Sequence, residues 1–451
     1  MIQLPGEAEL ELQRMPRLVL RAEIGPYDRR DPAVGGDRPP VRLYRDVPGI
    51  EHSMIDPADP ELIDDREVYV GADLSGRMLG LGAIAHRINL HLNSSEASEL
   101  SVEVDNIDNL FSHVCLGAPR AGLPHWLLRN NWHLGRILRV RGGVRDADGL
   151  FHYFPLYEGI IEGATQGERR ITLSAYDPLR AFSGIIIEDN PTYTDETAAA
   201  IVEDLINTYT GEPGATPQTY ARPLIDYQSF DDAAAASPFL LRITGSGAST
   251  LQGMNLAEAI ALVALHGLGV VWIDGRRHVR FTIKETRTQY ATFRLDADRN
   301  LLDARLSLGL EYMRNKVTVS YGASETEFTV TNDASILRYY EQAASFNLPF
   351  AHTEANAEIW AYRFLTDFGW PPLTLEAVAD LTALGLECGD WAQVFHAGLG
   401  IEDLRFQAFS TDLDPGQKTV RIVCHNTDPS LREGGTFIWG VSAIDSMDRF
   451  I

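Results

Sequence analysis

Alternation of apolar and polar residues marks two stretches of the chain, one around residue 173 and the other around residue 422. Residues i, i+2 and i+4 of a strand lie on one face of a sheet, so each stretch is predicted to be a strand with one buried face. The apolar positions are Ile171, Leu173 and Ala175 in the first stretch and Val420, Ile422 and Cys424 in the second. A third alternating run has Leu100, Val102 and Val104 at its apolar positions.

The first two strands each close a longer unit that begins with a glycine. One unit opens at Gly135-Arg-Ile-Leu-Arg-Val and the other at Gly389-Asp-Trp-Ala-Gln-Val. Their second halves begin at Gly167 and Gly416 and share the pattern G-[EQ]-[RK]-x-[IV]-x-[LI]-x-[AC]. The separations are similar, 167 − 135 = 32 and 416 − 389 = 27 residues. A repeat in fixed order predicts two copies of one domain, and chance similarity of two ordinary hairpins is the alternative.

The region between the two units changes to a helical pattern. A helix is predicted from a cap at Thr194 to a stop at Gly211, and a second begins at Asn255, where Glu258 completes a capping box. The apolar stripe of the first helix is Ile201, Leu205, Ile206 and Tyr209. A hairpin that turns at Asp274 follows the second helix, and helix followed by hairpin predicts a small α+β domain.

The remaining segments complete the outline. Residues 18–24 form a strand candidate, and the Pro-rich residues 25–65 are predicted to be a long loop or extended arm. A third helix fits residues 353–368, and a turn follows Asp414. The side chains of that helix expected to face inward are Ile359, Trp360, Phe364, Leu365 and Phe368.

These elements predict a mainly β (α+β) chain with two similar β-barrel domains, an intervening small α+β domain and a helical insertion. The expected boundaries are an N-terminal strand and arm at 1–66, a first tube-type barrel at 67–185, a peripheral α+β domain at 186–300 and a second barrel at 301–451. The helical insertion is expected at about residues 335–372. The length of 451 residues suits two to four domains of ordinary size.

The net charge of the chain limits the classes of function that the sequence supports. It has 63 Asp and Glu residues against 39 Lys and Arg residues, a formal net charge of −24 at pH 7. Proteins that grip nucleic acid cluster Lys and Arg to neutralise phosphates, and no such cluster occurs in the sequence. An acidic surface repels DNA instead, although acidity also serves solubility.

No motif for catalysis or for binding a cofactor stands out. The loop that begins at Gly245 is rich in Gly and Ser but lacks the Lys of a phosphate-binding loop, and the turn at Asp146 lacks the later ligands of a calcium loop. Cys115, Cys388 and Cys424 are far apart and odd in number, which indicates free thiols and synthesis in the cytoplasm. We therefore predict no catalytic residues, no cofactor-binding residues, no metal-binding residues and no bound cofactor.

Membrane insertion is not expected either. No apolar run approaches the roughly 20 residues that span a bilayer, and the N-terminus has no basic region followed by an apolar core, as a secretory signal would have.

Several passages, in their order along residues 67–425, resemble the tail-tip and baseplate hub proteins of tailed bacteriophages, the family of the T-even phage hub and of many minor tail proteins. They are Ser101-Val-Glu-Val-Asp-Asn, Phe154-Pro-Leu-Tyr-Glu-Gly-Ile-Ile-Glu-Gly, Arg170-Ile-Thr-Leu-Ser-Ala-Tyr-Asp-Pro, the helix and hairpin of residues 261–281, Asn315-Lys-Val-Thr-Val-Ser-Tyr-Gly and Cys388-Gly-Asp-Trp-Ala-Gln-Val. The Pro-rich residues 25–65 depart from the pattern of that family.

The resemblance implies a structural virion protein without enzymatic activity, made in the host cytoplasm. Such a hub is a homotrimer whose six barrels form a ring, which joins the sixfold tail tube to the threefold tip and lets DNA pass through its lumen. The implied partners are a distal tail protein or tail tube, tip, spike or receptor-binding proteins, and the tape-measure protein. A hexameric distal-tail adaptor and a carbohydrate-active β enzyme are the alternatives; the repeat disfavours the adaptor, which needs one barrel per chain.

Overall fold

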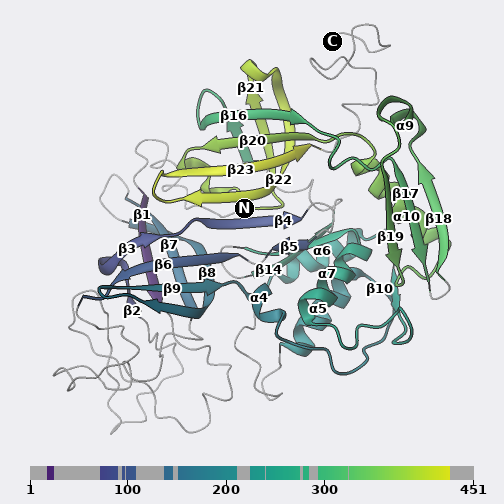
Figure 1. Ribbon diagram of the computed structural model, residues 1–451, viewed down its shortest axis with the longest axis horizontal. Coiled ribbons are helices and arrows are strands. Elements are labelled where there is room, and N and C mark those ends of the chain that lie inside the picture. The colour runs from purple at the N-terminus through teal and green to yellow at the C-terminus, as the bar shows by residue number, and fades with distance from the viewer. Residues whose placement is uncertain are drawn as a thin grey trace.

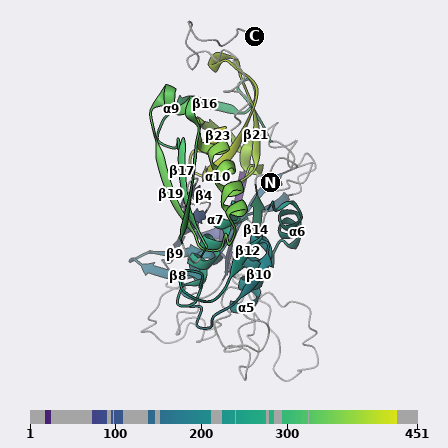
Figure 2. The same ribbon diagram turned by 90° about the vertical axis from the view of Figure 1, so that its right-hand side faces the viewer.

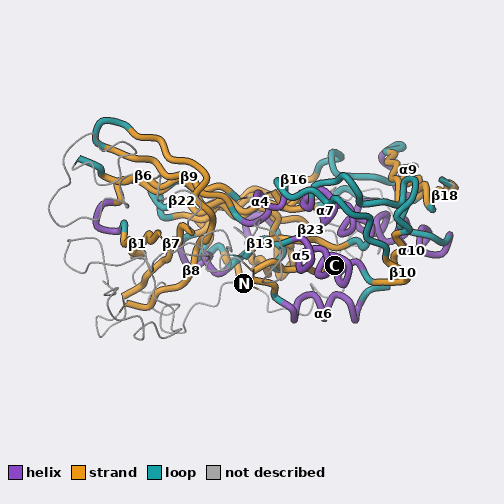
Figure 3. Tube along the Cα trace, turned by 90° about the horizontal axis from the view of Figure 1, so that it is seen from below, coloured by secondary structure: helices purple, strands orange, loops and turns teal. Residues whose placement is uncertain are grey.

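The structure is a computed structural model that describes residues 18–24, 72–89, 94–96, 98–107, 137–145, 151–210, 224–238, 240–274, 278–283, 293–322 and 325–426. The prediction of a mainly β fold with two similar barrel-type sheets and a smaller α+β part is confirmed. The two large curled sheets lie one above the other in Figure 1. The helices gather at the opposite end of the molecule from β1, β7 and β8 (Figure 3).

The first large sheet has seven strands in the order β2-β1-β7-β8-β9-β6-β3, and every adjacent pair is antiparallel. Its strands are β1 (Leu18–Ile24), β2 (Ala72–Asp73), β3 (Met78–Leu81), β6 (Glu99–Asp105), β7 (Ile137–Arg145), β8 (Phe151–Gln166) and β9 (Arg170–Tyr176). The strand predicted at residues 18–24 is therefore β1, which lies beside β7.

The second large sheet has eleven strands, with β11-β14-β13-β5-β4-β22-β23-β20-β16 as its main path and β21 and β15 branching from β22. Its strands are β4 (Ile84–Asn89), β5 (Ser94–Glu96), β11 (Leu224–Ile225), β13 (Gly269–Ile273), β14 (His278–Ile283), β15 (Phe293–Asp296), β16 (Leu301–Leu308), β20 (Leu373–Ala379), β21 (Trp391–His396), β22 (Ile401–Asp414) and β23 (Thr419–Asn426). Two short strands, β4 and β5, come from the N-terminal part of the chain and link this sheet to the α+β part.

The α+β part packs its helices around β13 and β14. The helices are α4 (Pro178–Phe182), α5 (Ala198–Tyr209), α6 (Tyr227–Ala236) and α7 (Leu256–His266), and a small sheet joins β10 (Tyr193–Glu196) to β12 (Leu241–Ile243). The predicted capping box of α7 is present, because Asn255 accepts from the amide of Glu258 and the Glu258 carboxylate accepts from the amide of Asn255. The predicted hairpin is β13–β14.

A third sheet lies at the edge of the molecule and carries a long helix on one face (Figure 2). Its elements are β17 (Lys316–Tyr321), β18 (Thr326–Thr331), β19 (Ala343–Leu348), α9 (Asp333–Tyr339) and α10 (Glu354–Phe368). Within the described residues, 3-10 turns occur at η2 (Ser75–Arg77), η3 (Leu381–Gly385) and η4 (Ala397–Leu399). The helix α10 matches the prediction for residues 353–368, with Thr353 as its N-cap.

Two hydrophobic cores hold the fold together. One core lies between the two large sheets and contains residues of both, which makes the sheets a single packed body. The other joins the α+β part to the third sheet through α7 and α10, where the indole of Trp360 donates to the carbonyl of Leu265 at 2.9 Å.

Two details of the predicted helices are wrong. The first helix begins at Ala198 with Thr197 as its cap, and Thr194 lies in strand β10. Asp195 has a positive φ of 56°, which a continuous helical turn does not allow. In α10, Ile359 is 36% exposed, because the buried stripe follows the i, i+3, i+4 spacing and position 359 falls outside it.

Several predictions fall on residues outside the described part of the chain. They are the Pro-rich arm at 25–65, the hairpin tip at 146–149, Gly135, Gly211 and Cys115.

Truncation of core residues tests whether the two large sheets are equally important for stability. Leu173→Ala and Ile422→Ala each remove a side chain that is 1% exposed in the shared core. We expect each to lower the free energy of unfolding by about 2–4 kcal/mol in urea titrations, because a cavity replaces buried methyl groups. Leu337→Ala, at a leucine that is 90% exposed, is the matched control and should change it by about 0.5 kcal/mol or less. A neutral effect of either core substitution would contradict the shared core.

Candidate functional site: the duplicated sheets and their junction

Five strands of the first sheet have counterparts in the second sheet. The order β7-β8-β9-β6-β3 matches β21-β22-β23-β20-β16, and all four neighbouring pairs are antiparallel in both sheets. In each set the three strands β7, β8, β9 or β21, β22, β23 follow one another in the chain, and the strands on the far side come earlier. The two sets therefore have the same connectivity as well as the same order.

The register of the ladders is also the same. In one sheet Val104 lies opposite Ile171, and in the other Ala379 lies opposite Val420. The other pairs of equivalent residues follow from the same ladders, and both residues of every pair are buried. The equivalent residues are Leu100 and Leu375, Val102 and Ala377, Val104 and Ala379, Ile171 and Val420, Leu173 and Ile422, and Ala175 and Cys424. The equivalence predicted for the last three pairs is confirmed.

Irregularities in the ladders coincide as well. Each five-stranded set has three register shifts, one in each of three strand pairs. They follow Met78, Val140 and Ile161 in the first sheet and Leu301, Val394 and Ala408 in the second, and these are equivalent positions. A bulge leaves one residue unpaired and bends its strand, so three matching bulges give both sheets a similar curl. Three coincident bulges exclude chance similarity of two hairpins.

The glycines that revealed the repeat stand just before equivalent strands. Ile137 opens β7 opposite Ile160, and Trp391 opens β21 opposite Gln407, so Ile137 and Trp391 are equivalent. Gly389 has a φ of +89°, a conformation that other residues rarely adopt, and its amide donates to the carbonyl of Ala408 at 2.8 Å.

A single short strand fixes the two sheets relative to each other. Strand β4 leaves the first unit directly after β3 and pairs antiparallel with β22 of the second unit, with Ala85 opposite Asp412. Ile84 at the start of β4 and Leu413 in β22 are both buried in the shared core. The thiol of Cys388 donates to the carbonyl of His86 at 2.9 Å and ties the loop before β21 to the same strand.

The buried thiols are not suited to nucleophilic chemistry. Burial raises the pKa of Cys388 to about 12, and burial together with the nearby Cys388 raises the pKa of Cys424 well above its usual range. A thiol with a raised pKa carries almost no thiolate at neutral pH, and the thiolate is the reactive form. The prediction of buried free thiols is confirmed for these two cysteines.

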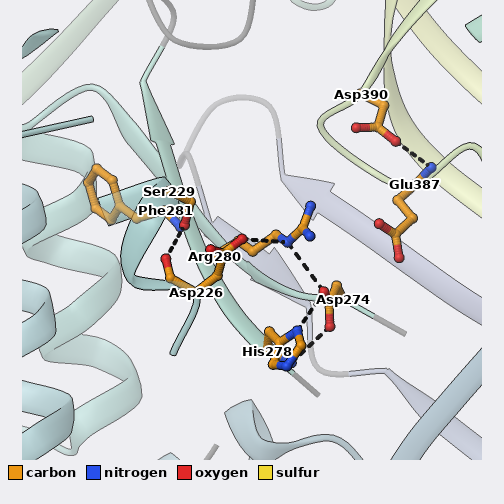
Figure 4. Close-up of polar contacts among 8 residues, drawn as sticks. All are labelled: Asp226, Ser229, Asp274, His278, Arg280, Phe281, Glu387 and Asp390. Atoms are coloured by element: carbon orange, nitrogen blue, oxygen red, sulfur yellow. Dashed lines mark hydrogen bonds and ion pairs between the residues drawn. The ribbon is translucent and has the colours of Figure 1, made fainter. Parts of the chain in front are cut away.

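A charged cluster of the α+β part lies at its junction with the loop before β21 (Figure 4). The Nε of Arg280 on β14 lies 3.2 Å from Oδ2 of Asp274 and 3.3 Å from Oδ2 of Asp226. Burial by itself lowers the pKa of Arg280, but the charges of Glu387 and of these carboxylates outweigh it and raise that pKa. Arg280 is therefore charged and attracted to both sides of the junction.

The histidine of this cluster is paired with the same carboxylate. The Nδ1 of His278 lies 3.2 Å from Oδ2 of Asp274, and its backbone amide donates to Oδ1 at 2.8 Å. The hydrogen bond between the two side chains raises the pKa of His278, although partial burial of the histidine by itself lowers that pKa. Burial would raise the pKa of Asp274, but His278 and Arg280 outweigh that effect and lower it. Both partners are thus stabilised in their charged forms, which favours a structural role for the cluster.

Two arginines of the first sheet lie beside carboxylates of neighbouring strands. Arg139 contacts Glu158 at 2.9 Å, and Arg170 contacts Glu103 at 2.9 Å. Sequence patterns identified the strands but gave no sign of these cross-strand partners, because partner identity depends on register. They also gave no sign of the β4–β22 pairing or of the cluster around Arg280.

Metal binding and membrane insertion find no support in the described part of the chain. Among the residues that the structure describes, no group of three or more His, Cys, Asp or Glu side chains is arranged to hold a metal ion. Within the same residues, no helix has the length and apolar character needed to cross a bilayer.

Comparison with known proteins gives the following matches. No protein-family model matches the chain, and no curated protein matches it. Among solved structures it is similar to a tail protein from Neisseria meningitidis MC58, with a TM-score of 0.48, 11% identity, and coverage of 77% of this chain and 91% of that one. It is similar to the 43 kDa tail protein of prophage MuSo2 from Shewanella oneidensis, with a TM-score of 0.45, 13% identity, and coverage of 78% and 95%. It is also similar to the prophage tail protein gp18 from Listeria monocytogenes EGD-e, with a TM-score of 0.45, 13% identity, and coverage of 77% and 89%. All three are tail proteins by name, and two of them come from prophages.

The junction cluster gives a prediction for the pH dependence of stability. The pKa of His278 is raised in the fold above 6.5, so its stabilising effect is complete below about pH 6.5 and is lost as the pH rises through the raised pKa. We expect His278→Asn to destabilise the protein by about 0.5 kcal/mol more at pH 5.5 than at pH 8.5 in urea titrations, a modest value because water screens a partly exposed pair.

The same substitution in an Asp274→Asn background is the control, since the partner carboxylate is then absent. The pH dependence of the effect should disappear in that background. An equal effect of His278→Asn at both pH values in the wild-type background would show that the ion pair contributes nothing.

Proposed function

We propose that this protein is a structural component of a phage tail, the hub of the baseplate or tail tip. Three chains form a ring that joins a sixfold tail tube to a threefold tip. The observation that carries the proposal is the duplication of one five-stranded sheet, with the same order, register and bulges, within one chain. A trimer of such chains presents six similar sheets. Its ring has threefold symmetry and a nearly sixfold arrangement of sheets, so it can contact a sixfold partner on one side and a threefold partner on the other.

The contact between the two sheets of one chain provides the pattern for closing the ring. Within the chain, the end of the first unit lies against the β22 side of the second through β4. In the proposed ring, the second unit of one chain lies against the first unit of the next chain in a similar way. The proposed boundaries are 67–185 and 301–451 for the two barrels, which β1 and β15 extend by one flanking strand each, and 186–300 for the α+β domain. That domain and the helical insertion at about 335–372 lie outside the ring.

The polar faces of the two sheets suit a lumen through which DNA slides. The face opposite the shared core carries carboxylates and arginines together, and Arg139 and Arg170 are each paired with a carboxylate. An arginine that is already paired is less available to a phosphate, and unpaired carboxylates repel it. The formal charge of three chains is 3 × −24 = −72. Salt screens this repulsion beyond about 8–10 Å, so carboxylates at the wall act on DNA only at short range.

The proposed partners follow from this place in the particle. They are a distal tail protein or tail tube on one side, tip, spike or receptor-binding proteins on the other, and the tape-measure protein within the tail. The protein would be made in the host cytoplasm and would reside in the virion. It would have no enzymatic activity of its own, because its buried thiols have raised pKa values and the carboxylates of the junction cluster are paired.

The mass of the purified protein in solution tests the trimer. One chain has a mass of 50.0 kDa, so light scattering coupled to size exclusion should give about 150 kDa. A mass near 300 kDa would favour the hexameric adaptor. A monomer that hydrolyses host polysaccharide, with activity lost on substitution of one carboxylate, would favour the carbohydrate-active enzyme.

A further inference from the structure

The third sheet has an outward face built from hydroxyl and amide side chains. Its other face packs under α10, where Val317, Val319 and Val330 are buried in the core that this sheet shares with the α+β part (Figure 2). Side chains alternate along a strand, so the residues between these positions lie on the outward face. Six of the outward residues carry a hydroxyl or an amide, and none of the six is buried. We call them the hydroxyl face; they are Thr318, Ser320, Thr329, Thr331, Ser345 and Asn347.

The centre of the hydroxyl face is a row of three hydroxyls. Thr318 pairs with Thr329 on one side and with Ser345 on the other, and the Oγ1 atoms of the two threonines are 3.0 Å apart. The first duplicated sheet instead carries ion pairs between neighbouring strands on its polar face, such as Arg139 with Glu158. A hydroxyl both donates and accepts hydrogen bonds, whereas an arginine only donates and a carboxylate only accepts. The centre of this face therefore suits an uncharged ligand that has hydroxyl groups of its own.

The charged residues in the same rows lie at the ends of the face and favour no charged ligand. Lys316 lies at one end and is paired with Glu341 at 3.0 Å, and Glu327 lies at the other end. A nucleic acid needs several cations to neutralise its phosphates. A protein partner is usually anchored by aromatic residues or arginines at the centre of an interface, where Ser and Thr contribute little. A polysaccharide, which is recognised through neutral hydrogen bonds, fits the face better.

Tyr340 lies at the same end of the sheet as Lys316, in a strained backbone conformation. It follows α9 with a φ of 63° and a ψ of 169°, a combination that residues other than glycine rarely adopt. Its side chain is 82% exposed, so packing in a core does not offset the strain. Strained residues cluster at ligand-binding sites. An exposed tyrosine ring offers a flat apolar surface, which suits the apolar face of a sugar ring.

A buried asparagine fixes the strained turn to the sheet. The Nδ2 of Asn315 donates to the carbonyl of Tyr340 at 2.7 Å, and its Oδ1 accepts from the amide of Gln342 at 2.7 Å. Asn315 is fully buried and directly precedes β17. The residue after Tyr340, Glu341, reaches Lys316 on the outward side of the sheet. These contacts hold Tyr340 at the edge of the hydroxyl face.

We propose that the hydroxyl face and Tyr340 together bind an uncharged polysaccharide. The tyrosine ring packs against the apolar face of one sugar ring, and the hydroxyls of the central row exchange hydrogen bonds with sugar hydroxyls. The contact is non-covalent, and no bond of the sugar is broken. The third sheet belongs to neither duplicated sheet, so this binding does not depend on the proposed ring.

A microarray of bacterial surface polysaccharides, both uncharged and anionic, tests the proposal on the purified protein. We expect the wild type to bind one or more uncharged polysaccharides and to bind none of the anionic ones more tightly, because the chain has a net charge of −24 and repels them. Isothermal titration calorimetry with the bound polysaccharide then gives a Kd for each variant, and the thermal midpoint shows that the variant is folded.

Substitutions on the face should weaken this binding by about tenfold or more. Thr318→Val combined with Thr329→Val removes two hydroxyls and keeps the branched shape that strands favour. Tyr340→Ala removes the stacking ring. Tyr362→Ala is the matched control, because this tyrosine is 52% exposed on α10, on the other side of the sheet. It should change the Kd by less than about twofold.

Tyr340→Gly separates a binding role from a structural one. Glycine adopts the observed φ and ψ without strain, so this variant should keep or raise the midpoint of urea unfolding while it loses the binding. A lower midpoint would show that Tyr340 is retained for stability and would overturn the proposal.

Four binding results would also overturn it. They are a wild type that binds no uncharged polysaccharide, a preference for anionic polysaccharides, an unchanged affinity of the folded Thr318→Val/Thr329→Val or Tyr340→Ala variant, and an equal loss of affinity in Tyr362→Ala. None of these results bears on the proposed tail role, which the mass of the oligomer tests separately.

Discussion

The antiparallel pairing of β4 with β22 is the interaction on which the rest of the architecture depends. Strand β4 belongs in sequence to the first unit and in space to the second sheet. Its backbone hydrogen bonds set the offset between the units, and Ile84 adds an apolar contact to the core that both sheets share. A one-residue slip of this pairing would turn Ile84 away from that core, so the position of one sheet on the other is strongly specified. The β5–β13 pairing then attaches the α+β part to the same seam, and the charge of Glu387 attracts Arg280 across it.

The duplication gives the chain two surfaces with different chemistry in each sheet. One face of each sheet is aliphatic and is buried between the sheets, whereas the other carries arginines and carboxylates, such as Arg139 and Glu158 in the first sheet and Arg87 and Asp412 in the second. Cross-strand ion pairs on the polar face satisfy the arginines locally, and exposed pairs of this kind add little stability. Their main consequence is that these arginines already have carboxylate partners within the sheet. The differences between the units lie at their flanks, where β1 runs antiparallel to β7 but β15 runs parallel to β21.

Much of this fold is readable from the sequence because its signals are local. Period-2 alternation placed β9 and β23, the capping box placed α7, and the cap at Thr353 placed α10. The first helix was placed three residues too early because two threonines compete as caps, and only the tertiary structure, in which Thr194 pairs with Arg242, decides between them. The path of β4 into the other sheet and the partners of the charged side chains are long-range choices that alternation does not encode. The bulges that follow Met78 and Leu301 have no local sequence signature.

A cryo-EM reconstruction of the purified oligomer, with threefold symmetry imposed, tests the central claim most directly, namely that the two sheets of one chain are equivalent modules of one ring. We expect β6–β9 and β20–β23 to lie at the same radius and height, related by a rotation of about 60°, with Glu103 and Arg170 facing the lumen. Two sheets at different radii or heights, or a reconstruction without a central channel, would contradict it.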